Sequence, residues 1–187
     1  MRIIRSKEYK ITSWSGGTTT EIYLYPEDGN YSRKQFFYRI STATIETLES
    51  VFTVLPGVER VIVPLENKMI LRHEEEEVVL SPYEPYRFPG ERNTRSRGIN
   101  RDFNLMMNHG KRGNVEILTI SQGSSSIEEA VDTLYYYAEG KETIGVGGET
   151  LFPGDSILVK TQERIELVNS SSEKVTLIKV VMSDLSD

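Results

Sequence analysis

The chain has 187 residues, of which 37% are hydrophobic and 27% are charged, a composition typical of globular proteins. Its net charge of −6 disfavours nucleic acids and anionic membranes as partners, because both attract basic surfaces. The absence of cysteine excludes disulfides, thiolate nucleophiles, iron–sulfur clusters and cysteine-ligated zinc. No apolar segment has the length of a signal peptide or a membrane span, so we expect a cytoplasmic protein.

Strand signals dominate the chain. Aromatic and β-branched side chains recur in short runs, several of which alternate polar and apolar residues as half-buried strands do. Pro26 and Gly29 close the first run, while Glu66 and Asn67 are expected to form a short hairpin turn. The expected strands are residues 19–25, 35–45, two runs within 60–73, 78–80, 103–107, 115–121, 133–138, 143–146, 156–160, 165–169 and 175–182. This pattern indicates an all-β protein, built as an antiparallel sandwich or barrel.

Three polar segments interrupt this pattern. Residues 124–130 begin with serines that precede glutamates by three positions, which predicts either one helical turn or a loop. Four consecutive glutamates, residues 74–77, are expected at the solvated end of a hairpin. Residues 91–101 contain four arginines and almost no apolar side chain, so they form either a mobile connector or a flap over an anionic ligand.

A short internal repeat suggests two related halves. Phe-Pro-Gly followed by an acidic residue occurs at residues 88–91 and again at residues 152–155. No linker rich in Pro, Gly or Ser separates the two halves near residue 113, where an expected strand follows at once. We therefore expect two β-barrel-like halves, residues 1–113 and 114–187, packed as one unit.

The second copy of the repeat resembles the second conserved motif of the cupin superfamily. Gly154 and Asp155 match the turn that opens a strand in this motif, but Ile165 occupies the position of its metal-binding histidine. His73 and His109, the two histidines of the chain, each stand alone in charged, polar surroundings. A zinc or iron site needs several nitrogen or oxygen ligands that converge on one point. We therefore expect no metal and no other cofactor.

Four motifs of the first half occur in this order: WSGGTTTEI, YRISTATI, FTVLPGVER and RDFNLMM. Together they resemble the HutD/Ves family, small bicupin proteins of bacteria often associated with histidine utilisation, and the resemblance runs from about residue 11 to the end of the chain. Tyr38 departs from the family pattern, which usually has tryptophan before the arginine. The resemblance implies a bicupin, in which both halves are cupin-like jelly rolls or β-barrels and the first half carries the pocket.

Strand alternation selects the residues that can line such a pocket. Arg39 and Ser41 share one face of their strand, and a small, polar face suits a ligand cavity better than a core. Gly16 and Gly17 are expected to bring backbone N–H groups to the cavity rim. The expected ligand-binding residues are Trp14, Gly16, Gly17, Thr18, Glu21, Arg39, Ser41, Arg60, Asp102 and Asn104.

Several of these residues also have a purely structural explanation. Glu21 can form a buried ion pair with Arg39 or Arg60, and Arg60 can equally be a surface arginine. Asp102 and Asn104 lie on one strand face, opposite the phenylalanine between them. They face solvent if that ring packs in the core; the family resemblance favours the cavity.

Three classes of function follow. The first is a metal-free carboxylate-binding protein. The resemblance implies a role as a metabolite sensor or regulator in histidine catabolism, with urocanate or N-formylglutamate as the ligand. Here we expect Arg39 to be the main anion anchor and Arg60 the second. The next is a metal-independent isomerase or hydrolase, with Glu21 and Asp102 as acid–base candidates. The last is a structural or interaction protein with a vestigial pocket.

Overall fold

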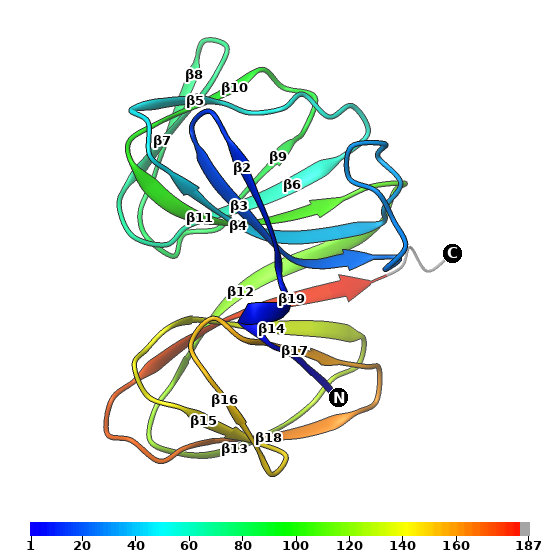
Figure 1. The fold of residues 1–187 in the computed structure, drawn as a ribbon, viewed down its shortest axis with the longest axis vertical. Helices are drawn as coiled ribbons and strands as arrows, with labels where there is room; N and C mark the ends of the chain where they lie inside the picture. Colours follow the sequence, from blue (N-terminus) through cyan, green and yellow to red (C-terminus); the bar gives the residue numbers. More distant parts are fainter. Residues whose placement is uncertain (184–187) are drawn as a thin grey trace. The chain divides into compact units, whose positions relative to one another are not determined.

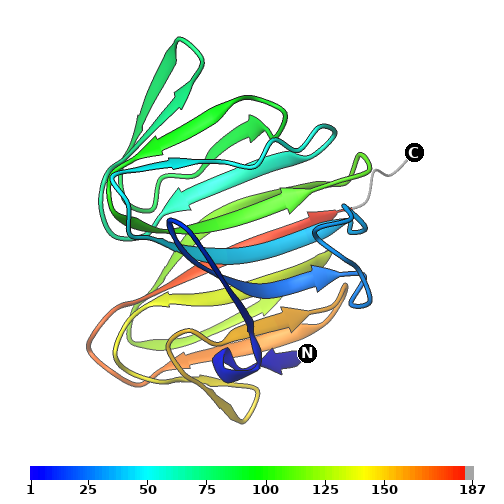
Figure 2. The ribbon, with the colours of Figure 1, turned by 45° about the horizontal axis from the view of Figure 1, so that its top comes forward.

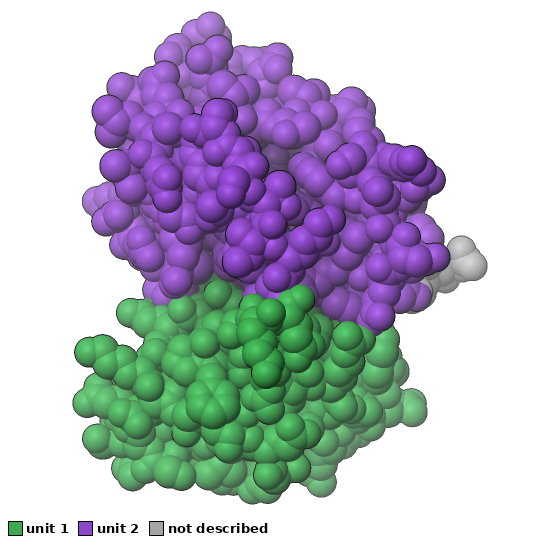
Figure 3. Space-filling model, viewed as in Figure 1, with its two compact units in different colours: residues 1–8, 113–187 green, residues 9–112 purple. Residues whose placement is uncertain are grey.

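The computed structural model describes residues 1–183, which are almost entirely strands and turns (Figure 1). The chain divides into two compact units (Figure 3). Unit 1 comprises Met1–Glu8 and Gly113–Asp187, and unit 2 comprises Tyr9–Arg112. None of the described helical segments has the length and apolar character needed to cross a membrane.

Unit 2 consists of two antiparallel sheets. Its strands are β2 (Lys10–Trp14), β3 (Gly17–Tyr25), β4 (Tyr38–Ile45), β5 (Glu49–Val51), β6 (Glu59–Pro64), β7 (Met69–His73), β8 (Glu76–Leu80), β9 (Tyr86–Pro89), β10 (Thr94–Arg97) and β11 (Asn100–Met107). The six-stranded sheet has the order β2-β3-β4-β11-β6-β9, and the four-stranded sheet has the order β5-β10-β7-β8. The long strands β3 and β4 run side by side (Figure 2).

An apolar cluster joins the two sheets of unit 2. It comprises Ile45, Ile62 and Phe88 from the six-stranded sheet, and Met69, Leu71 and Leu80 from the four-stranded sheet. All six side chains are buried. The cluster therefore fixes the inner face of the six-stranded sheet against its partner, and this inner face continues into the cavity described below.

Unit 1 repeats the two-sheet plan. Its elements are β1 (Arg2–Ile4), the 3₁₀ turn η1 (Ser6–Glu8), β12 (Arg112–Ile120), β13 (Gly123–Glu128), β14 (Asp132–Glu139), β15 (Ile144–Val146), β16 (Glu149–Leu151), β17 (Ser156–Val159), β18 (Arg164–Asn169) and β19 (Val175–Ser183). The sheets have the orders β1-β17-β14-β19-β12 and β13-β18-β15-β16. The first eight residues belong to unit 1 because β1 pairs with β17, with Ile3 opposite Ile157.

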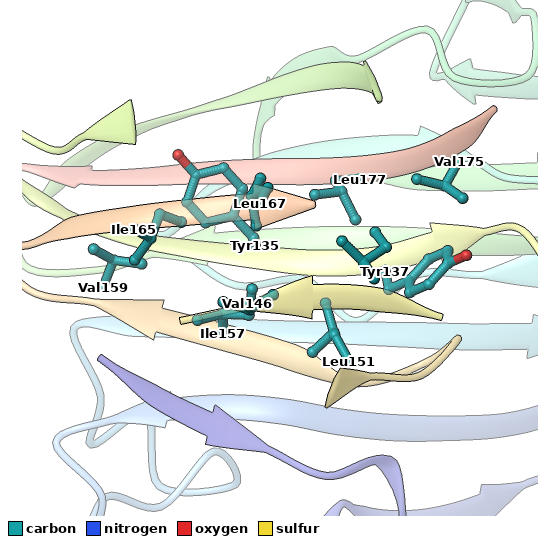
Figure 4. Packing of buried hydrophobic residues seen from close by; sticks show 11 residues of the cluster. Tyr135, Tyr137, Val146, Leu151, Ile157, Val159, Ile165, Leu167, Val175 and Leu177 are labelled. Atoms are coloured by element: carbon teal, nitrogen blue, oxygen red, sulfur yellow. The ribbon is translucent and has the colours of Figure 1, made fainter. Parts of the chain in front are cut away.

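Side chains fill the interior of unit 1. Tyr135, Tyr137, Ile165 and Leu167 are buried there among other aliphatic residues (Figure 4). Ile165 occupies the position at which the cupin motif has a metal ligand, and here it packs in the core. The expected all-β architecture of antiparallel sheets is therefore present, with a packed interior in this unit.

Two predictions of secondary structure are wrong, because strands distant in the sequence pair with these segments and determine their conformation. Residues 124–130 form neither a helical turn nor a loop, since most of them belong to β13, which pairs with β18 and places Ile127 opposite Ile165. The two runs within residues 60–73 do not form a hairpin, because β6 and β7 belong to different sheets. Asn67 instead exchanges hydrogen bonds with Asn100: the side-chain amide of Asn100 donates to the Asn67 carbonyl at 2.6 Å.

Residues 91–101 are neither a connector nor a flap over most of their length. They contain β10 and the start of β11, and β10 is paired on both sides, with β5 and with β7. Thr94, Ser96 and Asn100 are the inward residues of this segment, and all are buried. A strand with small polar inward residues lacks the apolar alternation by which strands are detected in a sequence. The acidic turn at residues 74–75 does lie at a hairpin end, as expected, between β7 and β8.

Candidate functional site

A cavity of about 630 Å³ lies within unit 2. Its main wall is the inner face of the six-stranded sheet, with side chains from β2, β3, β4, β6 and β11. Residues 29–32 and 50–53 contribute the remaining polar and aromatic lining. This volume lies in the range typical of small-molecule sites in proteins.

Most of the residues expected at the site line this cavity: Trp14, Glu21, Arg39, Ser41, Arg60, Asp102 and Asn104. Strand register brings them together. Ser41 pairs with Glu21 on one side and with Asn104 on the other, while Met106 pairs with both Arg39 and Arg60. Paired residues of an antiparallel sheet point to the same face, so these side chains converge on one space.

Thr18 and the two adjacent glycines do not line the cavity. Thr19 lies there instead, because side chains of β3 alternate and Glu21 is two residues further along the same face. A Cβ atom on Gly17 would lie 1.8 Å from the carbonyl oxygen of Thr44, and the φ of Gly17 is 151°. Gly17 therefore permits close backbone approach between β3 and β4.

Replacing Gly17 should destabilise the protein strongly. Gly17→Ala is expected to lower the free energy of unfolding by about 3 kcal/mol or more, because backbone strain and a clash with fixed main chain add together. Gly123→Ala is the matched control: Gly123 also has a positive φ, of 130°, but no described atom lies within 4 Å of its added Cβ. Urea unfolding at constant m-value measures both variants. Equal losses for the two variants would show that close strand approach is not the reason for Gly17.

Arg39 is held in an ion pair within the cavity. Its Nε donates to Glu21 Oε2 at 2.7 Å, and its Nη1 makes a long contact of 3.5 Å to Ser41 Oγ. The guanidinium carbon lies 3.9 Å from the ring centroid of Tyr31, in cation–π geometry. Arg39 is 7% exposed, and the ion pair with Glu21 already supplies it with a counter-ion inside the protein.

Arg60 is a buried cation that forms no ion pair among the described residues, although the nearby Asp102 carboxyl acts to raise its pKa. It is 6% exposed, and its guanidinium lies 4.7 Å from the ring centroid of Phe52 and 5.3 Å from that of Phe88. Its Nε donates a long hydrogen bond of 3.4 Å to Asn104 Oδ1. Within residues 1–183 no carboxylate forms an ion pair with it, and its Nη groups have no hydrogen-bond acceptor. Burial lowers the pKa of Arg60 to about 10, so it remains charged at neutral pH.

Asp102 is a buried carboxyl group in the same wall. It is 3% exposed, and burial raises its pKa to about 7, although Arg60 and a hydrogen bond from Asn104 each act to lower it. Because Asn104 Oδ1 accepts from Arg60, its NH₂ group is the part that donates to Asp102. Arg60, Asn104 and Asp102 thus form a continuous polar row across β6 and β11.

Tyr31 and Phe52 were missed as site residues. Both stack on an arginine of the cavity, yet neither lies on the strands that carry Arg39 and Arg60. Phe52 falls within the FTVLPGVER motif quoted above, which was the one available signal for it. Tyr31 lies in the turn-rich stretch after β3, where no periodicity indicates a direction for the side chain.

His73 does not stand in polar surroundings, contrary to the interpretation of the sequence. It is fully buried, with its ring centroid 5.0 Å from that of Phe88 and 5.7 Å from that of Tyr86. Thr94 Oγ1 donates to the Arg92 carbonyl, so Nδ1–H of His73 donates to Thr94 Oγ1 at 2.9 Å. Burial lowers its pKa, and the side chain packs as a neutral aromatic ring in the core beside the site.

The cupin-like turn of unit 1 has a structural role. Asp155 is buried and accepts hydrogen bonds from the side chain of Arg5 at 2.9 Å and from the backbone of Ser6 at 2.8 Å. It also accepts from the backbone of Phe152 at 3.2 Å. Within residues 1–183 no group of three or more His, Cys, Asp or Glu side chains is arranged to hold a metal ion. Asp155 thus ties the N-terminal segment to the turn before β17.

The family model described as HutD matches residues 6–177. The chain belongs to the HutD family. Among solved structures, HutD from Pseudomonas fluorescens SBW25, determined in a formate condition, shares 24% identity over 97% of this chain and 98% of that one, with a TM-score of 0.73. PA5104 from Pseudomonas aeruginosa PAO1, a conserved protein of unknown function, shares 23% identity over 98% of each chain, with a TM-score of 0.81.

More distant structures show the same fold as this HutD-family chain. A vicilin from Solanum melongena, in which different anionic ligands occupy structurally similar pockets, has 8% identity and a TM-score of 0.70, over 98% of this chain and 85% of its own. Oxalate decarboxylase also has 8% identity and a TM-score of 0.70, over 97% of this chain and 77% of its own. No curated protein sequence is significantly similar to this one. The predicted all-β cupin fold and the predicted family are confirmed.

Proposed function

We propose that this protein binds a small carboxylate in the cavity of unit 2, without a metal, and that it acts as a metabolite sensor or regulator in histidine catabolism. The observation that carries the proposal is the guanidinium of Arg60, a buried cation that lines the cavity and forms no ion pair among the described residues. A buried charge is costly unless it is paired, and a bound anion supplies the missing partner.

Arg60 is a better anchor than Arg39, although the sequence suggested the reverse order. Glu21 already compensates Arg39 at 2.7 Å, whereas the Nη groups of Arg60 remain available for two parallel hydrogen bonds to a carboxylate. Phe52 and Phe88 hold the guanidinium plane in position. A pre-positioned donor loses little conformational freedom when the ligand binds, which favours affinity.

The lining of the cavity supports binding over a vestigial pocket. A pocket without function would be filled with large apolar side chains, as the interior of unit 1 is (Figure 4). The cavity of unit 2 instead contains two arginines, the hydroxyl of Ser41 and the amide of Asn104. The vicilin with anionic ligands in its pockets and the HutD crystallised in a formate condition are consistent with an anion site in this fold.

A reaction on the bound carboxylate is the second candidate, and one observation favours it. The pKa of Asp102, raised to about 7 by burial, suits a group that takes up and releases a proton at neutral pH. Glu21 is a weaker candidate because its carboxylate is engaged by Arg39. Proton NMR of each ligand incubated with the protein separates the classes: a binding protein leaves the ligand spectrum unchanged over hours, whereas an isomerase or hydrolase produces new signals.

A ligand panel tests the binding proposal directly. We expect urocanate, N-formylglutamate or a related small carboxylate to raise the melting midpoint by about 5–10 °C at a hundred times its dissociation constant, since saturation at that level adds about 2.7 kcal/mol. The neutral amide of the same acid is the matched control and is expected to give no shift. If no carboxylate in the panel shifts the midpoint at any pH from 5.5 to 8.5, the proposal is wrong.

A further inference from the structure

The net charge of the cavity depends on whether the carboxyl group of Asp102 is protonated or ionised. The charged and titratable groups that share the cavity with Asp102 are Lys10 from β2, Glu21 from β3, Arg39 from β4, Arg60 from β6 and Tyr31 from the turn after β3. Glu21 and Arg39 cancel each other as an ion pair. When Asp102 is protonated, an incoming anion meets the positive charge of Arg60 alone. When Asp102 is ionised, the anion also meets a negative charge beside Arg60.

We propose that Asp102 takes up a proton when a carboxylate enters the cavity, and that the neutral carboxyl group then donates a hydrogen bond to the bound anion. The proton comes from solvent and stays on Asp102, so each carboxylate bound at alkaline pH brings one proton with it. This inference rests on the proposed carboxylate binding and adds its regulation by pH.

The geometry of the polar row supports this coupling. Asp102 and Asn104 lie two residues apart on β11 and line the cavity together with Arg60, to which Asn104 is hydrogen-bonded. A carboxylate bound by the Arg60 guanidinium therefore shares one buried cavity wall with the Asp102 carboxyl group. Two carboxylates in one buried site cannot both remain ionised, so one of them holds a proton.

Other features favour Asp102, and not the ligand, as the group that holds the proton. Asp102 has no ion-pair partner among the described residues and is 3% exposed, so its charged form is poorly solvated. Burial already raises its pKa to about 7, and an adjacent anion raises it further. The ligand carboxylate, in contrast, gains the guanidinium of Arg60, which favours its ionised form.

Calorimetry with formate tests the inference. Formate remains ionised throughout the range from pH 5.5 to 8.5, so any proton taken up on binding is held by the protein and not by the ligand. Titrations in two cationic buffers of different ionisation enthalpy, at one chloride concentration, report the protons bound per formate. We expect uptake near zero at pH 5.5 and close to one proton at pH 8, with affinity falling roughly 20-fold from pH 6.5 to pH 8.5.

Asp102→Asn is the matched variant, because the amide keeps the shape and a hydrogen-bond donor but does not titrate. It is expected to bind formate with less than a twofold change in affinity over the same range and with no proton uptake. ¹³C NMR of the Asp102 carboxyl group in the wild type gives an independent test that requires no variant. The pKa of this group should rise when formate is added.

The outcomes separate this inference from the proposed function. Formate binding that depends on Arg60 but takes up no proton at pH 8 would overturn the role of Asp102 and leave carboxylate binding intact. Uptake that persists unchanged in Asp102→Asn would assign the proton to another group and equally overturn it. Absence of binding by formate and by every larger carboxylate would overturn both.

Discussion

Arg60→Met is expected to remove most of the stabilisation that carboxylates give this protein. Methionine retains a long side chain that can pack on Phe52 and Phe88, but it removes the charge that a bound anion pairs with. Removing one partner of a desolvated charge pair costs about 2–5 kcal/mol in binding, so the dissociation constant should rise roughly 30-fold or more. Thermal shift and calorimetry with the best ligand of the panel measure the loss.

The unliganded Arg60→Met protein should be at least as stable as the wild type. The substitution removes a buried cation that forms no ion pair among the described residues, and an apolar side chain of similar length suits the aromatic surroundings. Arg97→Met is the matched control, because Arg97 is an exposed residue of β10 with 58% side-chain exposure and lies outside the cavity lining. It should bind as the wild type does. An equal carboxylate shift in Arg60→Met and the wild type would contradict the assignment of the anchor.

Asp102→Asn should change how stability depends on pH. Burial raises the folded-state pKa of Asp102 to about 7, from an ordinary value of 3.8, so the folded protein binds this proton more tightly than the unfolded chain does. The resulting stabilisation is fully present below pH 4 and is lost as pH rises through 7. Between pH 5 and pH 8 the wild type should lose about 2–3 kcal/mol relative to the variant, which has no group to titrate here.

Urea unfolding of both proteins without ligand, at several pH values, measures this difference. All other titrating groups are common to the two proteins, so subtraction isolates Asp102. Asp28→Asn, at an exposed position, is the control and should follow the wild type at every pH. Parallel curves for the wild type and Asp102→Asn would mean that Asp102 ionises normally in the folded state.

The chain's local patterns determine the class of fold. Alternation in β3, β4 and β11 and the turn residues between strands were sufficient to predict an antiparallel all-β protein. The cupin type of this fold was implied only by the resemblance to family motifs. These patterns did not predict β10 and β13, because the sequences of both strands are polar. Both segments are strands because they pair with strands that are distant in the sequence. The pairing of β1 with β17 was likewise invisible, because the two strands lie at opposite ends of the chain.

The same distinction applies to the site. A period of two residues places Arg39 with Ser41, and Asp102 with Asn104, on one strand face, and any strand model of these segments predicts as much. Which guanidinium meets which carboxylate depends on register between strands. A register shift between Glu21 and Tyr23 accompanies the pairing of Glu21 with Ser41, and Glu21 reaches Arg39. Arg60 is left beside two aromatic rings and an uncharged amide, and Asp102 acts on it without forming an ion pair. Side-chain direction is a local property of the chain, whereas the lack of an ion pair for Arg60 among the described residues results from every strand that surrounds the cavity, so only the tertiary structure could decide it.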